Sequence, residues 1–103
     1  MNKNNNDYEN IDLDINKITA AVELAQKLID DLYDEDPNGN TFTQRGFLDG
    51  KQIVLDYIEH NEFGCAVMHL LYMIHESEID FPMQIKKEVH QIAKNNNIEN
   101  YFK

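Results

Sequence analysis

Cysteine, glycine, proline and basic residues are all scarce in this chain of 103 residues. The single cysteine excludes an internal disulfide, so nothing in the sequence indicates an oxidising compartment. No apolar run approaches the length of a membrane-spanning helix, and the polar N-terminus lacks the apolar segment of a signal peptide. We therefore expect a cytoplasmic protein that does not associate with membranes.

Basic residues number only 9 against 19 acids, which gives a formal net charge of −10 at pH 7. Such a charge repels nucleic acid and anionic lipid, and it attracts basic surfaces. The hydrophobic fraction of 42% is normal for a folded protein, and the chain is long enough for one domain with a modest core. We therefore expect a basic protein as the partner, and no nucleic acid or membrane.

Helical periodicity dominates the sequence, and no segment shows the two-residue alternation of a strand. The predicted fold class is therefore all-α, as a compact single-domain bundle of four helices. Residues 1–10 are predicted to be a disordered N-terminal lead-in, and the helical domain is expected to span residues 11–103. Apolar residues three and four apart predict helices near residues 14–34, 43–60, 63–78 and 83–96.

The second predicted helix has Thr43 as its expected N-cap and Phe47 and Leu48 on its inner face. Gly46 and Gly50 lie four residues apart, so they would form a flat patch that another backbone could approach. The third helix is apolar on most of its sides, and such a helix belongs in the middle of a domain. Its leucines are therefore expected among the most buried residues of the protein.

The centre of the sequence, residues 56–82, reads DYIEHNEFGCAVMHLLYMIHESEIDFP. A helix leads into a turn at residues 60–64, which is followed by an apolar helix and an acidic exit. This order resembles the centre of the MafI family of immunity proteins, small bacterial proteins that neutralise the toxin domains of polymorphic secreted toxins. The chain departs from the family pattern at Asn61, where Gly is usual, and also at Cys65 and Phe81. The resemblance is carried by His60, Glu62, Phe63 and Gly64 in the turn, Ala66, Leu70 and Leu71 in the helix, and Ile79 and Pro82 in the exit.

The resemblance implies that residues 11–103 form an immunity domain that binds and neutralises a cognate toxin domain. A basic nuclease is the expected target, because enzymes that bind nucleic acid present cationic clefts that an acidic protein can fill. The family likeness makes an EndoU-type ribonuclease one candidate. No catalytic signature is present, so we expect neither enzymatic activity nor a cofactor.

Acidic residues crowd the end of the first predicted helix, where the helix dipole disfavours them. A sequence that breaks a local rule without compensation often does so at a functional site, although a solvated face that aids solubility is the alternative. We expect the toxin-binding surface to combine acids with aromatic anchors, and for one further aromatic, Phe63, core packing is the stronger expectation. The predicted binding residues are Asp30, Asp31, Tyr33, Asp34, Glu35, Asp36 and Phe42 at this helix end, and Asp56, Glu59, Glu62, Tyr72, Glu76, Glu78 and Asp80 around the third helix.

Two other interpretations stay open. One is a small helical regulatory or adaptor module that binds other proteins. The other is a degenerate EF-hand, because residues 34–45 carry Asp, Asn and Gly at several positions of a calcium loop. The twelfth position, which should supply a bidentate carboxylate, is Arg45, so we expect no calcium site tighter than millimolar.

The four histidines do not suggest a metal site, because none are three or four residues apart on one helix. His60 is expected to cap the end of the second helix, where a cation suits the helix dipole. His69 lies among apolar residues and is expected to be packed and hydrogen-bonded. We therefore predict no metal.

Overall fold

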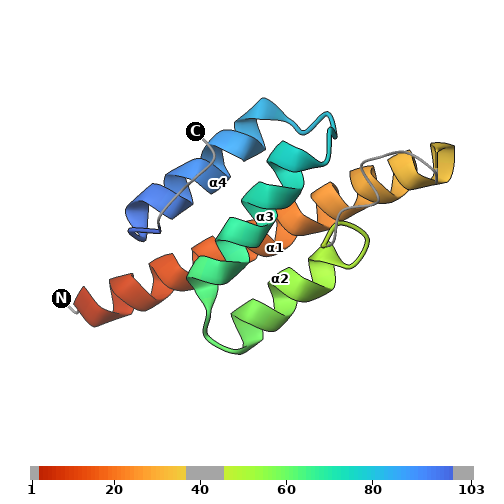
Figure 1. Ribbon diagram of the computed structural model, residues 1–103. Helices are drawn as coiled ribbons and strands as arrows, with labels where there is room; N and C mark the ends of the chain where they lie inside the picture. Colours follow the sequence, from red (N-terminus) through yellow and green to blue (C-terminus); the bar gives the residue numbers. More distant parts are fainter. Residues whose placement is uncertain (1–2, 37–45, 99–103) are drawn as a thin grey trace.

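The computed structural model describes residues 3–36 and 46–98. Within these ranges the chain forms four helices and no strand, which confirms the all-α prediction. The long α1 runs behind the others, α3 crosses it, and α2 and α4 lie on either side of α3 (Figure 1). The helices are α1 (Lys3–Glu35), α2 (Gly50–Glu59), α3 (Phe63–Glu76) and α4 (Met83–Asn95).

Helix α3 lies at the centre of the molecule and packs against all three other helices. Leu70 and Leu71 are fully buried, as the sequence predicts, and Val67 and Met73 are buried with them. Only a helix that is apolar on several sides can be covered by three neighbours, because each neighbour needs an apolar stripe to pack against. The composition of α3 therefore determines its central place.

Helix α1 contributes a stripe of buried residues, Ile18, Val22, Ala25 and Ile29, spaced three and four apart. The three- and four-residue apolar spacing of the sequence already begins at Ile11, which predicts burial from there on; Ile11 is 48% exposed, so the buried stripe starts later. The helix itself begins at Lys3, whereas the sequence predicts a disordered lead-in over residues 1–10. Once a helix is nucleated, each added residue gains a backbone hydrogen bond, so a helix can begin before the apolar spacing that predicts it.

Helix α2 begins at Gly50, whereas the sequence predicts a start near residue 43. Residues 46–49 form a turn, and Thr43 lies outside the described residues. Phe47 is buried from this turn, but Leu48 is 47% exposed, so its assignment to an inner helix face was wrong. A turn does not preserve the helical spacing that the assignment assumed.

The flat patch expected at the two glycines of this region is filled by side chains of α3 and not by another backbone. A Cβ atom at Gly46 would lie 2.6 Å from Cε1 of His69, and one at Gly50 would lie 2.5 Å from Cε of Met73. His69 Nε2 also lies 2.9 Å from the carbonyl oxygen of Gly46, so His69 is packed and hydrogen-bonded as expected. Gly46 and Gly50 thus let two α3 side chains fit beneath the start of α2.

Two helix ends are closed by Schellman motifs, in which an asparagine adopts the left-handed conformation. After α2, Asn61 has a φ of 60°, and Glu62 N–H donates to the Tyr57 carbonyl at 2.8 Å. After α4, Asn97 has a φ of 56°, and Ile98 N–H donates to the Ala93 carbonyl at 2.8 Å. These helix ends are fixed, because the last carbonyls that a helix leaves without partners are hydrogen-bonded.

The buried amide of Gln26 joins α1 to the start of α2. Its Nε2 donates to the carbonyls of Phe47 at 3.0 Å and Leu48 at 3.3 Å, while its Oε1 accepts from Lys51 N–H at 2.8 Å. The N-cap residue of α2, Asp49, makes no side-chain capping bond. Gln26 therefore supplies from another helix the acceptor that a local N-cap residue usually provides.

We expect Gln26→Leu to lower the free energy of unfolding by about 1–3 kcal/mol, because it removes the partner of the part-buried Lys51 N–H and that of the Leu48 carbonyl. Denaturant unfolding measures the change. The control is Gln52→Leu, which removes an exposed side-chain bond to Asp56 and should change stability by less than about 0.5 kcal/mol. Equal losses in the two variants would contradict the role given to Gln26.

We expect Glu78→Gly to raise the free energy of unfolding by about 0.5–1 kcal/mol, because a left-handed residue with a Cβ atom is strained. Glu78 follows α3 with a φ of 63° and is exposed, so the substitution removes strain without removing packing. Glu78→Ala removes the same charge but keeps the Cβ atom, and it should give no comparable gain. If both variants gain equally, the effect comes from charge and not from the backbone.

Candidate functional site

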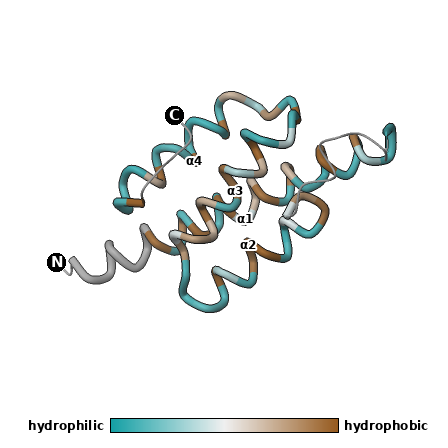
Figure 2. Tube along the Cα trace, viewed as in Figure 1, coloured by the Kyte–Doolittle hydropathy of each residue, from teal (hydrophilic) through white to brown (hydrophobic). Residues whose placement is uncertain are grey.

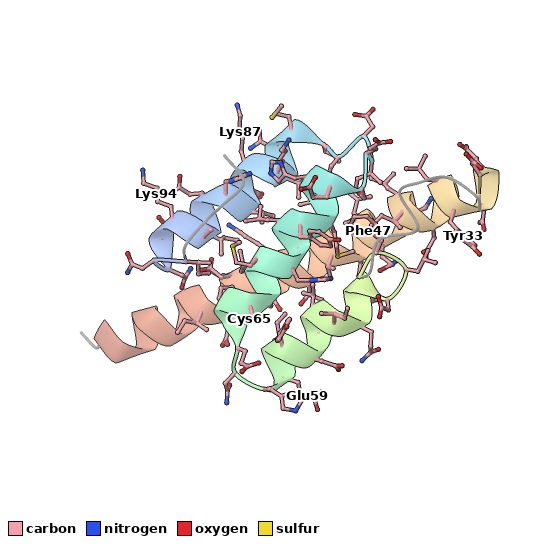
Figure 3. All side chains as sticks on the ribbon, in the orientation of Figure 1. Tyr33, Phe47, Glu59, Cys65, Lys87 and Lys94 are labelled. Atoms are coloured by element: carbon pink, nitrogen blue, oxygen red, sulfur yellow. The ribbon has the colours of Figure 1, made fainter. Side chains whose placement is uncertain are left out.

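The acidic end of α1, residues 30–36, comprises the last turns of the helix and Asp36, and within it Leu32 packs against the core. All five of its carboxylates are exposed, and Tyr33 among them is 37% exposed. Tyr33 lies near the tip of the molecule in Figure 3, and the last turns of α1 are mostly hydrophilic in Figure 2. This end is therefore available to a partner.

Little within the described residues neutralises the acidic end of α1. Lys27 forms an ion pair with Asp31 at 2.8 Å, and this hydrogen bond and the attraction to Asp31 raise the pKa of Lys27. Among the described residues Lys27 is the one cation in an ion pair with this cluster. Asp30 instead accepts from Gln26 Nε2 at 2.9 Å, so the amide that holds α2 also orients the first carboxylate of the acidic end.

A second acidic group surrounds the turn between α2 and α3. Asp56, Glu59 and Glu62 are exposed there, and Asp56 and Glu62 border a shallow hollow with Tyr57. His60 Nδ1 lies 2.7 Å from the carbonyl oxygen of Asp56. That contact, reinforced by the neighbouring carboxylates, raises the pKa of His60, and His60 is the C-cap of α2 as predicted.

The remaining predicted acids form a third group. Glu76, Glu78 and Asp80 are exposed at the other end of α3, where the chain leads into α4. Figure 3 shows Glu59 and Tyr33 at widely separated parts of the molecule. The predicted acids are thus distributed over three places and do not form one continuous face.

The aromatic candidates differ in exposure. Tyr33 is exposed, whereas Phe63 and Tyr72 are partly buried and pack against the core. The ring of Tyr72 stacks on Phe47 with centroids 5.0 Å apart, so its packing role is clear. Phe42 lies outside the described residues. Tyr33 is therefore the described aromatic whose position best suits an anchor.

One pair of polar residues escaped the sequence analysis. His75 of α3 and His90 of α4 place their Nε2 atoms 2.9 Å apart, with the rings edge-on at 83°. Burial lowers the pKa of both imidazoles, and the positive charge of Lys86 lowers both further. The spacing of fifteen residues carries no signal within one helix, so only the packing of α3 on α4 reveals the pair. No three His, Cys, Asp or Glu side chains gather to hold a metal ion in the described part of the chain.

No protein-family model matches the sequence, and neither a curated protein nor a solved structure matches it. Among the described helices, none is both long and apolar enough to cross a membrane. Charge, exposure and the residues of the central turn are therefore the features that bear on function.

We expect the His75–His90 pair to make stability fall as the pH decreases. The pKa of each imidazole in the folded state lies below its ordinary value of 6.5, so the unfolded chain binds more protons near that pH. The stability that the neutral pair contributes is fully present above about pH 6.5, and it is lost as the pH falls through the lowered pKa values of the two histidines. Denaturant midpoints measured across this range give the loss.

The control is a double variant, His75→Gln with His90→Gln, which keeps hydrogen-bonding side chains that do not titrate. This variant should lose less stability than the wild type between about pH 7.5 and pH 5. His60→Gln should not reduce the loss, because the pKa of His60 is shifted in the opposite direction. An unchanged pH dependence in the double variant would refute the role of the pair.

Proposed function

We propose that this chain is an immunity protein that binds and neutralises a cognate toxin domain, with the acidic end of α1 as its main docking surface. The observation that carries the proposal is the exposed cluster of five carboxylates and Tyr33, to which Lys27 alone among the described cations is paired. Such a cluster at a helix C-terminus opposes the helix dipole, and a basic partner would remove that cost.

The central turn supports the resemblance to MafI immunity proteins. The sequence has Asn61 where that family has Gly, and Asn61 adopts a φ of 60°, the region that favours glycine. Asn is the residue that next most readily accepts this conformation, so the departure preserves the geometry of the turn. The resemblance is thus compatible with the backbone at Asn61, one of the three residues where the chain departs from the family pattern.

A basic nuclease, such as an EndoU-type ribonuclease domain, is the proposed target. The active site of an enzyme that binds nucleic acid is cationic, so the carboxylates would attract it over long distances. The affinity would come from a few desolvated anchors, and Tyr33 is the described aromatic placed to serve as one. The acids would mainly increase the association rate and set the orientation.

A second candidate function is a small helical adaptor, and one observation favours it. Ile11 and Leu13 are 48% and 55% exposed, and they line a hollow with Asn95 and Asn96 at the end of α4. Exposed apolar residues around a hollow suit a protein contact. The neighbouring gene discriminates between the two functions, because an immunity gene directly follows the gene of its toxin.

The test is the association of the protein with the toxin domain encoded by the upstream gene. We expect the variant with Asp30, Asp31, Asp34 and Asp36 changed to Asn to associate more slowly at low salt, because steering is lost. Dissociation should change less, and the fold should be intact. Stopped-flow kinetics at several salt concentrations measure the effect, and Tyr33→Ala should act mainly on dissociation.

The matched control removes the same four charges elsewhere, by changing Asp56 and Asp80 to Asn and Glu59 and Glu62 to Gln. We expect this control to slow association less than the α1 variant does. Changes at Lys86 and Lys87 should matter little. If the α1 variant associates as fast as the wild type at low salt and still protects cells, the docking surface lies elsewhere.

A further inference from the structure

The outer face of α4 carries the opposite charge to the rest of the protein. Six side chains of α4 line a shallow hollow on this face. They form two adjacent rows, and within each row the residues are four apart in the sequence. Lys87 and Lys94 project from α4 on the side of the molecule away from Tyr33 (Figure 3). The rows are Lys86, His90 and Lys94, and Met83, Lys87 and Gln91.

The lysines of this hollow are not used inside the described structure. The ion pairs among the described residues involve Lys27 and Lys51, and none involves Lys86, Lys87 or Lys94. Lys86 and Lys94 lie on either side of His90 in one row, so their positive charges are concentrated around one hollow. The net charge of the whole chain is −10, so a concentration of cations on one helix face is more informative.

His90 connects the hollow to the interior. It lines the hollow, and its Nε2 contacts Nε2 of His75 on α3 at 2.9 Å. A protonated imidazole donates from both ring nitrogens, so protonated His90 can still donate from Nε2 to neutral His75. One added proton therefore keeps the bond between the helices and adds a positive charge at the hollow.

We propose that the hollow on α4 binds a small oxyanion of the phosphate or sulfate class, held by Lys86, Lys94 and His90. A free small anion fits better than nucleic acid or an anionic membrane, because the acidic remainder of the protein repels a large polyanion. The proposal does not depend on the toxin-binding function, since the acidic end of α1 and this hollow share no residue.

Anion binding at the hollow takes up a proton. The charged groups that act on the pair are Lys86 from α4, which lowers the pKa of both histidines, and Glu76 from α3, which raises that of His75. On α1, Asp14 accepts instead from Asn96 at the end of α4, at 3.0 Å. An anion beside Lys86 offsets its repulsion and favours protonated His90, so affinity increases as the pH falls.

The experiment is an NMR titration of the whole protein with sodium sulfate, against sodium chloride at the same ionic strength. Sulfate keeps its charge across the range, so any pH dependence belongs to the protein. We expect saturable shifts of the α4 amides and of both imidazoles with sulfate only. The affinity should rise between about pH 8 and pH 5.5 by up to tenfold per pH unit, the limit for one proton.

Three variants test the assignment. Lys86→Gln with Lys94→Gln should abolish saturable binding, whereas the charge-matched control, Lys27→Gln with Lys51→Gln, should bind like the wild type. His90→Gln should bind sulfate more weakly and without the pH dependence. His75→Gln leaves His90 in the hollow and should retain binding, which separates a lost ligand from a disturbed helix contact.

Several results would overturn the proposal. If sulfate and chloride cause equal changes in chemical shift, the changes report only ionic strength. If the two double-lysine variants bind sulfate equally, the anion lies elsewhere. A pH dependence that persists in His90→Gln would remove His90 from the site. Tighter binding of a short RNA or of anionic vesicles than of sulfate, lost in the same lysine variant, would assign the face to a macromolecule instead.

Discussion

Burial of α3 against three other helices is the constraint on which the rest of the structure depends. Because α1, α2 and α4 each place their apolar residues against α3, its two ends determine where the chain can turn. The turn at residues 60–62 and the exit at residues 77–82 are therefore fixed at opposite ends of one buried helix. This separation also keeps the acids of the α2–α3 turn apart from those that precede α4.

Gln26 is the second organising contact, and it couples packing to the candidate docking surface. The same amide holds the turn before α2, accepts the Lys51 N–H and donates to Asp30. A buried amide with several satisfied hydrogen bonds fixes geometry more strongly than apolar contacts do, because each bond has a preferred direction. The charges are also segregated, with acids at the end of α1 and lysines on α4, which gives an approaching basic protein a preferred orientation.

The candidate site was only partly predictable from the sequence. The acids near the end of α1 were identified because charge and position along a helix are local properties, and exposed Tyr33 lies among them as expected. Tyr72 was predicted as an anchor, yet it stacks on Phe47 at 5.0 Å. Side-chain spacing alone cannot distinguish an aromatic residue that faces a partner from one that faces the core.

The sequence by itself determined the helical class and the central place of α3, because three- and four-residue periodicity is a property of neighbouring residues. Only the tertiary structure decided where α2 begins, since Gln26, twenty-five residues before Lys51, caps it in place of a local residue. The His75–His90 contact has the same origin, because it exists only where α4 packs on α3. Contacts between distant segments depend on the packing of whole helices, and no short stretch of sequence encodes that packing.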